Sequence, residues 1–159
     1  MVIFSVKEVA LKDTGKPDVD WERWRKKAID ESVKQVYGAE RWLGRATRVT
    51  RSDGAQGLAL PDPDVRKVHR VAVAFGGRGS VPYHQGDFGK GFVHVLDEQS
   101  LRTVVRELDT ISDFVDYLAA KEELLGRASL IMQGQEEDLL ALYIHQGRTF
   151  PTGPDLLVV

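Results

Sequence analysis

The stretch VIFSVKEV (residues 2–9) combines the composition of a buried β-strand with a lysine near its middle. Its β-branched and aromatic residues predict a strand, yet Lys7 stands among them. On an edge strand, a lysine discourages pairing with another chain. At the rim of a site, it holds a phosphate or activates a water molecule. The spacing alone favours the edge lysine, so the choice depends on the segments that come after this strand in the chain.

The bulk composition restricts the classes of function. A chain of 159 residues predicts one domain with one substantial core. Its 22 basic and 24 acidic residues give a net charge of −2. The chain as a whole is therefore not a basic nucleic-acid binder, and any nucleic-acid site has to be local.

The chain contains no cysteine. This excludes disulfides, thiolate zinc sites and cysteine nucleophiles, and it fits a reducing cytoplasm. The sequence has no apolar run near the ~20 residues of a membrane span, and its start lacks the pattern of a signal peptide. We therefore expect a cytoplasmic protein with no membrane partner.

Strand and helix patterns alternate up to residue 96. The stretch VHRVAVAF (residues 68–75) is the clearest strand, nearly all apolar, as a central strand covered on both faces would be. The other expected elements are a loop at 12–18, a helix at 19–43, a short strand at 46–51, turns at 52–64, a glycine-rich loop at 76–91 and a strand at 92–96.

Helical patterns dominate after residue 96. Asp97 is an expected N-cap, Thr110 and Asp113 have the spacing of a capping box, and an acidic helix start precedes a helix that ends at Gly147. A short strand is expected at 129–132. The tail DLLVV is apolar.

These patterns predict a single α/β (α+β) domain over residues 1–159, with a mixed central sheet flanked by helices. Residues 1–96 would form the α/β core and residues 97–159 a mainly helical part. Strand-like sequence at both ends has two interpretations: the chain is a fragment of a longer protein, or both segments are terminal strands docked at a sheet edge.

The expected helix at 19–43 places two polar residues on one face. Glu31 and Gln35 are four residues apart and share that face with Ala28 and Ala39, whose small side chains let a helix approach a sheet. A carboxylate and an amide there could face the same cleft as Lys7. The alternative is that Glu31 pairs with one of the helix's own lysines on a solvated surface.

A strand with Lys7, then a long helix with Glu31 and Gln35, then a hydrophobic strand resembles the core of the PD-(D/E)xK nuclease superfamily, the restriction-endonuclease-like group. VIFSVKEV would carry the (D/E)xK half of the motif, ESVKQVYGAERWL resembles the helix that follows it, and VHRVAVAF would be the next core strand. The resemblance covers about residues 1–75.

The resemblance implies roles for individual residues. Lys7 would face the phosphate, Glu31 would be a metal-binding acid that has moved to the helix, and Gln35 would assist. Ser5 stands where the family commonly has an acid. The family's first aspartate lies on a preceding strand that this sequence does not contain, so it either lies upstream in a longer chain or the protein is an inactive relative.

The chemistry of such a site needs more than one acid. Two carboxylates hold Mg²⁺ through oxygen atoms, the metal polarises the phosphate and lowers the pKa of bound water, and the lysine offsets charge on phosphoryl oxygens. With one carboxylate, the affinity for Mg²⁺ would be poor. We therefore expect a weak or inactive nuclease.

The glycine-rich loop at 76–91 matches neither GxGxxG nor GxxxxGK[ST]. It is expected to be a surface loop. It carries Arg78, His84 and Lys90, and such side chains could contact a nucleic-acid backbone.

The four histidines are far apart in the sequence, and no HExxH pattern is present. His69 and His94 fall in expected strands. There, a hydrogen-bonded core or interface histidine is a better interpretation than a metal ligand.

These observations lead to three candidate functions. The first is a nuclease-like domain acting on DNA or RNA phosphodiesters with Mg²⁺, inactive in this form if the missing acid is not supplied. The second is a non-catalytic binding or assembly module of a larger bacterial protein. The third, nucleotide binding by the glycine-rich loop, has little support. The expected partners are nucleic acid, a second copy of the chain, or the remainder of a longer chain.

Overall fold

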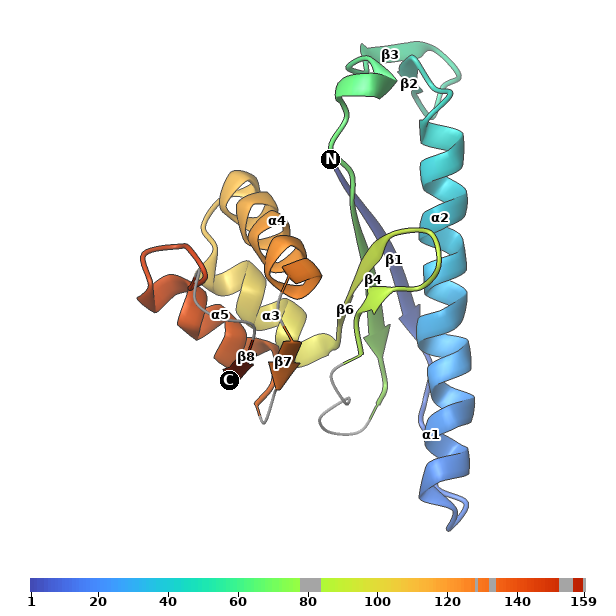
Figure 1. The fold of residues 1–159 in the computed structure, drawn as a ribbon. Coiled ribbons are helices and arrows are strands. Elements are labelled where there is room, and N and C mark those ends of the chain that lie inside the picture. Colours follow the sequence, from blue (N-terminus) through green and yellow to red (C-terminus); the bar gives the residue numbers. More distant parts are fainter. Residues whose placement is uncertain (78–83, 128, 132–133, 152–155, 159) are drawn as a thin grey trace.

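A computed structural model describes residues 1–77, 84–127, 129–131, 134–151 and 156–158. Its centre is a four-stranded sheet in the order β1-β4-β6-β5 (Figure 1). The strands are β1 (Val2–Glu8), β4 (His69–Phe75), β6 (Phe92–Leu96) and β5 (Gly86–Asp87). The first three are parallel and β5 is antiparallel to β6. The predicted α/β fold with a mixed sheet is confirmed.

One long helical rod covers one face of the sheet (Figure 1). It consists of α1 (Pro17–Arg25), a π-helical turn (Lys26–Asp30) and α2 (Glu31–Leu43). The rod connects the parallel strands β1 and β4, as a crossover between parallel strands requires. The helix predicted at 19–43 is confirmed, with a start two residues earlier.

The π-helical turn corrects one detail of the predicted helix face. Trp24 and Ala28 are buried, as expected. Beyond the turn, however, Val36 is fully buried, whereas Gln35 and Ala39 are exposed. Because a π turn holds more residues than an α turn, the buried stripe shifts around the helix at this point. The expectation that Gln35 and Ala39 share a sheet-facing stripe with Ala28 was therefore wrong.

A small antiparallel pair lies at the end of the rod. It is formed by β2 (Arg48–Thr50) and β3 (Gln56–Ala59). The first of these was predicted within 46–51, but residues 52–64 were expected to be turns throughout. Gly57 explains why a strand fits there: a Cβ atom at this position would approach the carbonyl oxygen of Val49 to 3.0 Å. The close pairing thus depends on a residue that usually signals a turn.

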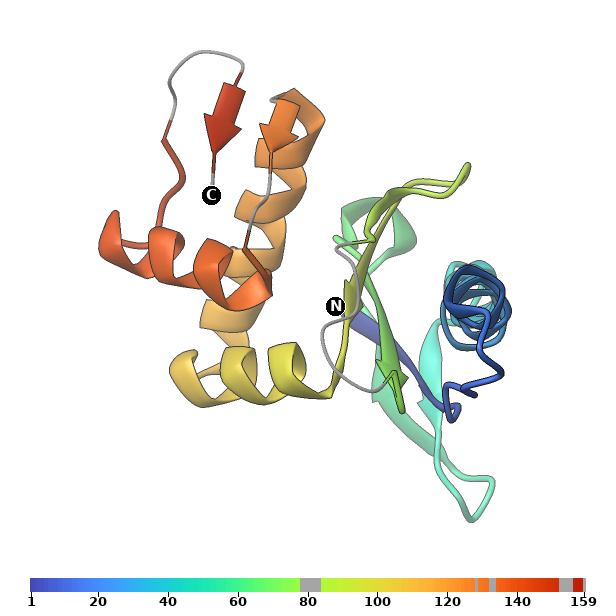
Figure 2. The same ribbon diagram turned by 90° about the horizontal axis from the view of Figure 1, so that it is seen from below.

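Three helices lie on the other side of the sheet (Figure 2). They are α3 (Glu98–Glu107), α4 (Ile111–Arg127) and α5 (Glu136–His145). A parallel pair of short strands, β7 (Ser129–Ile131) and β8 (Leu156–Val158), accompanies them. None of the helices in the described ranges is both long and apolar enough to cross a membrane.

The side chains predicted to cap helices are found at the starts of α3 and α4. The side chain of Asp97 accepts a hydrogen bond from the backbone N–H of Ser100 at 2.8 Å, which caps α3. Thr110 accepts one from the N–H of Asp113 at 3.1 Å at the start of α4, which is one of the two bonds of the predicted capping box. Each cap satisfies a backbone donor that the helix leaves unpaired.

The alternation of side chains along β4 separates two buried cores. Val71 and Val73 belong to the core with α3, α4 and α5, whereas Ala72 and Ala74 belong to the core under the long rod. Successive strand residues point to opposite faces, so a strand covered on both sides is apolar throughout. The prediction that residues 68–75 form a central strand is confirmed.

Candidate functional site

The structure brings Lys7 and Glu31 together, as predicted. The Lys7 Nζ donates a hydrogen bond to Glu31 Oε2 at 2.8 Å. The hydrogen bond from Lys7 lowers the pKa of Glu31 below its usual value. Glu31 keeps 53% of its side chain exposed, so the pair lies at the surface, where the rod passes the edge strand β1.

A second contact, between Ser5 and Gln35, lies beside it, and we call these two strand–helix contacts the ladder. The Ser5 hydroxyl donates to the amide oxygen of Gln35 at 2.7 Å. Two residues along a strand span about 6.6 Å, and four residues along a helix span about 6.0 Å. The distance between strand positions 5 and 7 therefore matches the distance between helix positions 35 and 31. As a result, the four polar side chains form two adjacent contacts.

The ladder does not by itself fit Mg²⁺. Glu31 supplies one carboxylate, and that carboxylate is engaged by Lys7. In the described part of the chain, one group of three or more histidine or carboxylate side chains is arranged to hold a metal ion, and Glu31 is not part of it. Because Mg²⁺ is bound through several oxygen ligands, it would need further carboxylates beside Glu31.

A cleft of about 340 Å³ opens beyond the carboxyl end of β1. Its lining residues are Val9, Ala10, Lys12, Asp20, Arg23, Trp24 and Lys27. Lys27 also lowers the pKa of Glu31 by its charge, which links the cleft to the ladder. Ligands of α/β proteins commonly bind at the carboxyl ends of parallel strands.

The acid and the tryptophan of the cleft are already engaged. The Asp20 carboxylate accepts hydrogen bonds from the Thr14 N–H at 2.7 Å and from its hydroxyl at 2.8 Å. The first of these is the main cause of its lowered pKa. Trp24 Nε1 donates to the Val9 carbonyl oxygen at 2.6 Å. The three cations therefore face a cleft whose one acid is held by neighbouring donors.

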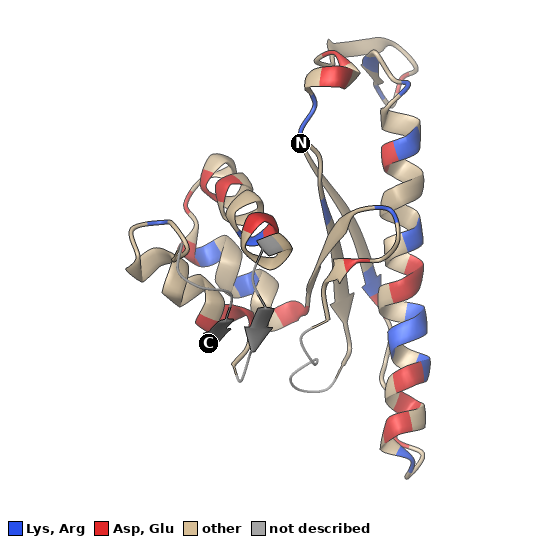
Figure 3. Cartoon of the chain, viewed as in Figure 1, with Lys and Arg blue, Asp and Glu red and all other residues tan. Residues whose placement is uncertain are grey.

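Positive and negative side chains are interleaved along the long rod (Figure 3). The rod as a whole is therefore not a uniform basic surface. The lining of the cleft has a local excess of positive charge, with three cations and one acid.

The described residues of the glycine-rich loop, 76–77 and 84–91, do not join the ladder. Arg78 lies outside the described residues. Lys90 is exposed in the turn between β5 and β6, at the amino end of β6. Because β6 and β1 are parallel to β4, this end is opposite to the carboxyl end of β1 that carries Lys7. His84 packs edge-on against Phe88, and burial lowers its pKa.

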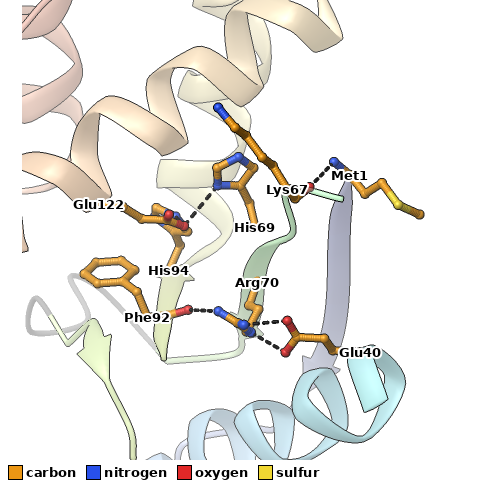
Figure 4. Close-up of polar contacts among 8 residues, drawn as sticks. All are labelled: Met1, Glu40, Lys67, His69, Arg70, Phe92, His94 and Glu122. Atoms are coloured by element: carbon orange, nitrogen blue, oxygen red, sulfur yellow. Dashed lines mark hydrogen bonds and ion pairs between the residues drawn. The ribbon is translucent and has the colours of Figure 1, made fainter. Parts of the chain in front are cut away.

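Two histidines and a glutamate converge on the other face of the sheet (Figure 4). Oε1 of Glu122 in α4 lies 3.0 Å from Nδ1 of His69 and 2.9 Å from Nε2 of His94. Both histidines are buried. The prediction that they are hydrogen-bonded core residues is confirmed, but no feature of the sequence indicated that they share one partner.

Glu122 and His94 have strongly perturbed pKa values. Burial raises the pKa of Glu122, but the hydrogen bonds from His69 and His94 outweigh it and bring it to about 2. Burial lowers the pKa of His94 to about 4, with the charge of Lys121 acting in the same direction. At neutral pH, Glu122 is therefore a carboxylate and His94 a neutral imidazole.

A buried ion pair fixes α4 next to this group. Lys121 Nζ lies 2.5 Å from Glu136 Oε1 of α5, and both side chains are almost fully buried. The Tyr117 hydroxyl donates to the same oxygen at 2.8 Å. Because Lys121 points to α5, its neighbour Glu122 is held on the side that faces the histidines.

A second ion pair ties the rod to the sheet near the same strands. Arg70 donates to both carboxylate oxygens of Glu40, at 2.6 and 2.5 Å, and to the carbonyl oxygen of Phe92 at 3.2 Å (Figure 4). Its guanidinium lies 5.8 Å from the centre of the Tyr37 ring. Arg70 thus joins α2, β4 and β6 in one polar contact.

No family model, curated protein or solved structure matches this chain. The resemblance to the PD-(D/E)xK nucleases therefore stays a prediction. The strand, helix and parallel strand of residues 1–75 agree with it, but this order is common to many α/β folds and does not define an activity.

Proposed function

We propose that this chain is a nuclease-like domain that binds the phosphodiester backbone of nucleic acid over the carboxyl end of β1 and does not cleave it on its own. The observation that carries the proposal is the 2.8 Å contact between Lys7 and Glu31, at the edge of a parallel strand–helix–strand unit.

Charge supports an anionic ligand at this place. The cleft next to the ladder is lined by Lys12, Arg23 and Lys27. Its one acid, Asp20, already accepts hydrogen bonds from the N–H and the hydroxyl of Thr14. Phosphate groups carry the negative charge of nucleic acids, and lysine and arginine side chains bind them readily. The net charge of −2 does not oppose this, because the positive excess is local.

The absence of cleavage is expected from the carboxylates. Glu31 offers one, and Lys7 neutralises it. Without further oxygen ligands, Mg²⁺ would bind weakly and would not polarise a phosphate. The domain would then retain recognition of the backbone but not the activation of water.

Binding is tested by fluorescence anisotropy with labelled single- and double-stranded DNA and RNA over a range of salt concentrations. Lys27→Ala should weaken binding and reduce the slope of log K against log salt by roughly 0.9 for a duplex if it contacts one phosphate. Arg106→Ala is the matched control, because Arg106 is exposed on α3. No binding, or equal losses in both variants, would refute the proposal.

Cleavage is tested in parallel with Mg²⁺ and Mn²⁺ on the same substrates. We expect intact substrate. Metal-dependent cleavage that Glu31→Gln abolishes would show that the domain is an active nuclease, and the non-cleaving part of the proposal would be wrong.

A specific observation favours an assembly module as the second candidate. Phe4 and Val6 on β1 are 48% and 57% exposed, and β1 is an edge strand of the described sheet. An edge strand with exposed apolar side chains is a site for association. Sedimentation of a dimer that Val6→Lys converts to a monomer would support this function; a monomer at all concentrations would exclude self-assembly.

A further inference from the structure

The group formed by His69, His94 and Glu122 has the composition of a transition-metal site. We propose that these three side chains bind one divalent first-row transition-metal ion, of which Zn²⁺ is the first to test. Their ligand atoms are Nδ1, Nε2 and a carboxylate oxygen, and all lie within 4.8 Å of one another.

The chemistry of the three ligands selects the class of metal. Two imidazoles and one carboxylate suit zinc and iron, whereas Mg²⁺ and Ca²⁺ prefer oxygen ligands alone. In a tetrahedral site with bonds near 2.0–2.1 Å, neighbouring ligand atoms lie about 3.3 Å apart. Glu122 Oε1 lies 3.0 and 2.9 Å from the two histidine nitrogens, close to this spacing, and the two nitrogens lie within 4.8 Å of each other.

The fold has built this group from three separate elements. His69 begins β4, His94 lies in β6, and Glu122 comes from α4. Two histidines that are 4% and 0% exposed both direct a nitrogen at one carboxylate. In the described structure, the other nitrogens, His69 Nε2 and His94 Nδ1, are buried without a hydrogen-bond partner.

This burial has a cost that hydrogen bonds to Glu122 only partly offset. A buried polar group without a hydrogen-bond partner loses its bonds to water and gains none in return, which is unfavourable. A bound metal would not pair these outward nitrogens, but its bonds to the inward nitrogens would be stronger than the hydrogen bonds to Glu122 and would offset more of this cost. The Glu122 side chain is 27% exposed, so the group is in part accessible to solvent through this residue.

The site is independent of the proposed nucleic-acid surface. His69 and His94 pair in register with Val2 and Val71, which pack toward α3, α4 and α5. Lys7 pairs with Ala74, which faces the long rod. Paired residues share a face of the sheet, so the two sites lie on opposite faces, and either can be present without the other.

The first experiment measures metal binding by the whole chain. The protein is stripped with a chelator and titrated with Zn²⁺, and separately with Co²⁺, whose visible absorption reports its geometry. His145→Ala is the control variant, because His145 is an exposed histidine outside the group. Wild type and His145→Ala should bind one equivalent, with an absorption spectrum of nitrogen–oxygen coordination.

The test variant is Glu122→Gln, which keeps the shape and one hydrogen-bond acceptor but removes the charge. Loss of a residue that only supports a ligand costs 10–100-fold in affinity, so loss of Glu122 itself should cost at least about tenfold. An affinity unchanged by Glu122→Gln, or one equivalent lost in His145→Ala, would overturn the proposal.

A measurement on the wild type tests the proposal without depending on whether a variant folds. The ¹⁵N chemical shifts of the imidazoles of His69 and His94 are recorded with and without Zn²⁺. Metal bonded to Nδ1 of His69 and Nε2 of His94 should shift these two nitrogens, and not those of His145. Unchanged shifts at saturating Zn²⁺ would mean a hydrogen-bonded His–Glu–His group without metal, and the proposal would be wrong.

Discussion

Replacing Lys121 by methionine should be one of the most destabilising single changes in this chain. The Lys121 ammonium is fully buried and lies 2.5 Å from Glu136, whose side chain is 3% exposed. Methionine fills a similar volume but leaves the Glu136 carboxylate buried without its cation. Breaking a buried ion pair by removing one partner costs about 3–5 kcal/mol, a large part of the roughly 5–15 kcal/mol that stabilises a domain.

The companion variant separates charge from packing. In Lys121→Met combined with Glu136→Gln, no uncompensated charge remains, and the amide oxygen can still accept the hydrogen bond from Tyr117. Replacing both members of a buried pair is often close to neutral. The double variant should therefore regain about 2 kcal/mol or more relative to Lys121→Met alone.

Urea unfolding followed by circular dichroism measures these differences. Arg102→Met is the matched control, because Arg102 and Glu98 form a pair on the surface of α3. Such exposed pairs contribute about 0–1 kcal/mol. A loss below about 1 kcal/mol in Lys121→Met, or a double variant no more stable than the single one, would refute a buried ion pair between α4 and α5.

Three other variants test the sheet and its loops. Ser5→Asp places an acid next to the ladder, so Mg²⁺, which prefers oxygen ligands, should raise the melting temperature of this variant and not of wild type; an equal response in both would contradict the nuclease-like site. Glu40→Gln removes the charge that Arg70 binds and should cost about 1–3 kcal/mol in urea unfolding; an unchanged midpoint would contradict it. Gly76→Ala should cost more than Gly54→Ala in the same assay. Both glycines have a positive φ, but a Cβ at 76 would meet a backbone oxygen at 2.4 Å, whereas 54 is open; equal losses would contradict the clash.

The elements that could be predicted from the sequence are those with strong local signals. The stretch VHRVAVAF indicated β4, and the caps at Asp97 and Thr110 indicated the starts of α3 and α4. These signals depend on neighbours within a few residues, which the sequence contains directly. The contact between Lys7 and Glu31 was also accessible, because a strand and the helix that follows it pack side by side in a β-α unit.

The π-helical turn lay beyond such reasoning. One extra residue in a turn moves every later side chain around the helix, and no residue pattern marks where it occurs. Gln35 was expected on a sheet-facing stripe with Ala39. Both are exposed, yet Gln35 still reaches Ser5 from the flank of the helix. The pairwise contact was therefore easier to predict than the buried face.

The histidine–glutamate group required three facts that are not local. His69 and His94 share a face only because β4 and β6 pair with Val71 opposite His94. A shift by one residue would have turned His94 toward the long rod. Glu122 reaches them from α4, whose rotation is fixed by its buried side chains, Lys121 with its ion pair to Glu136 among them. Strand register and helix rotation are set by the whole core, so the two histidines could be predicted as buried but not as partners.

If the proposed metal binds, it holds together β4, β6 and α4, the same elements whose register and rotation create its site. Metal binding should then stabilise the packing of β4, β6 and α4, and removal of the metal should weaken it. The ladder on the opposite face of the sheet should be unaffected.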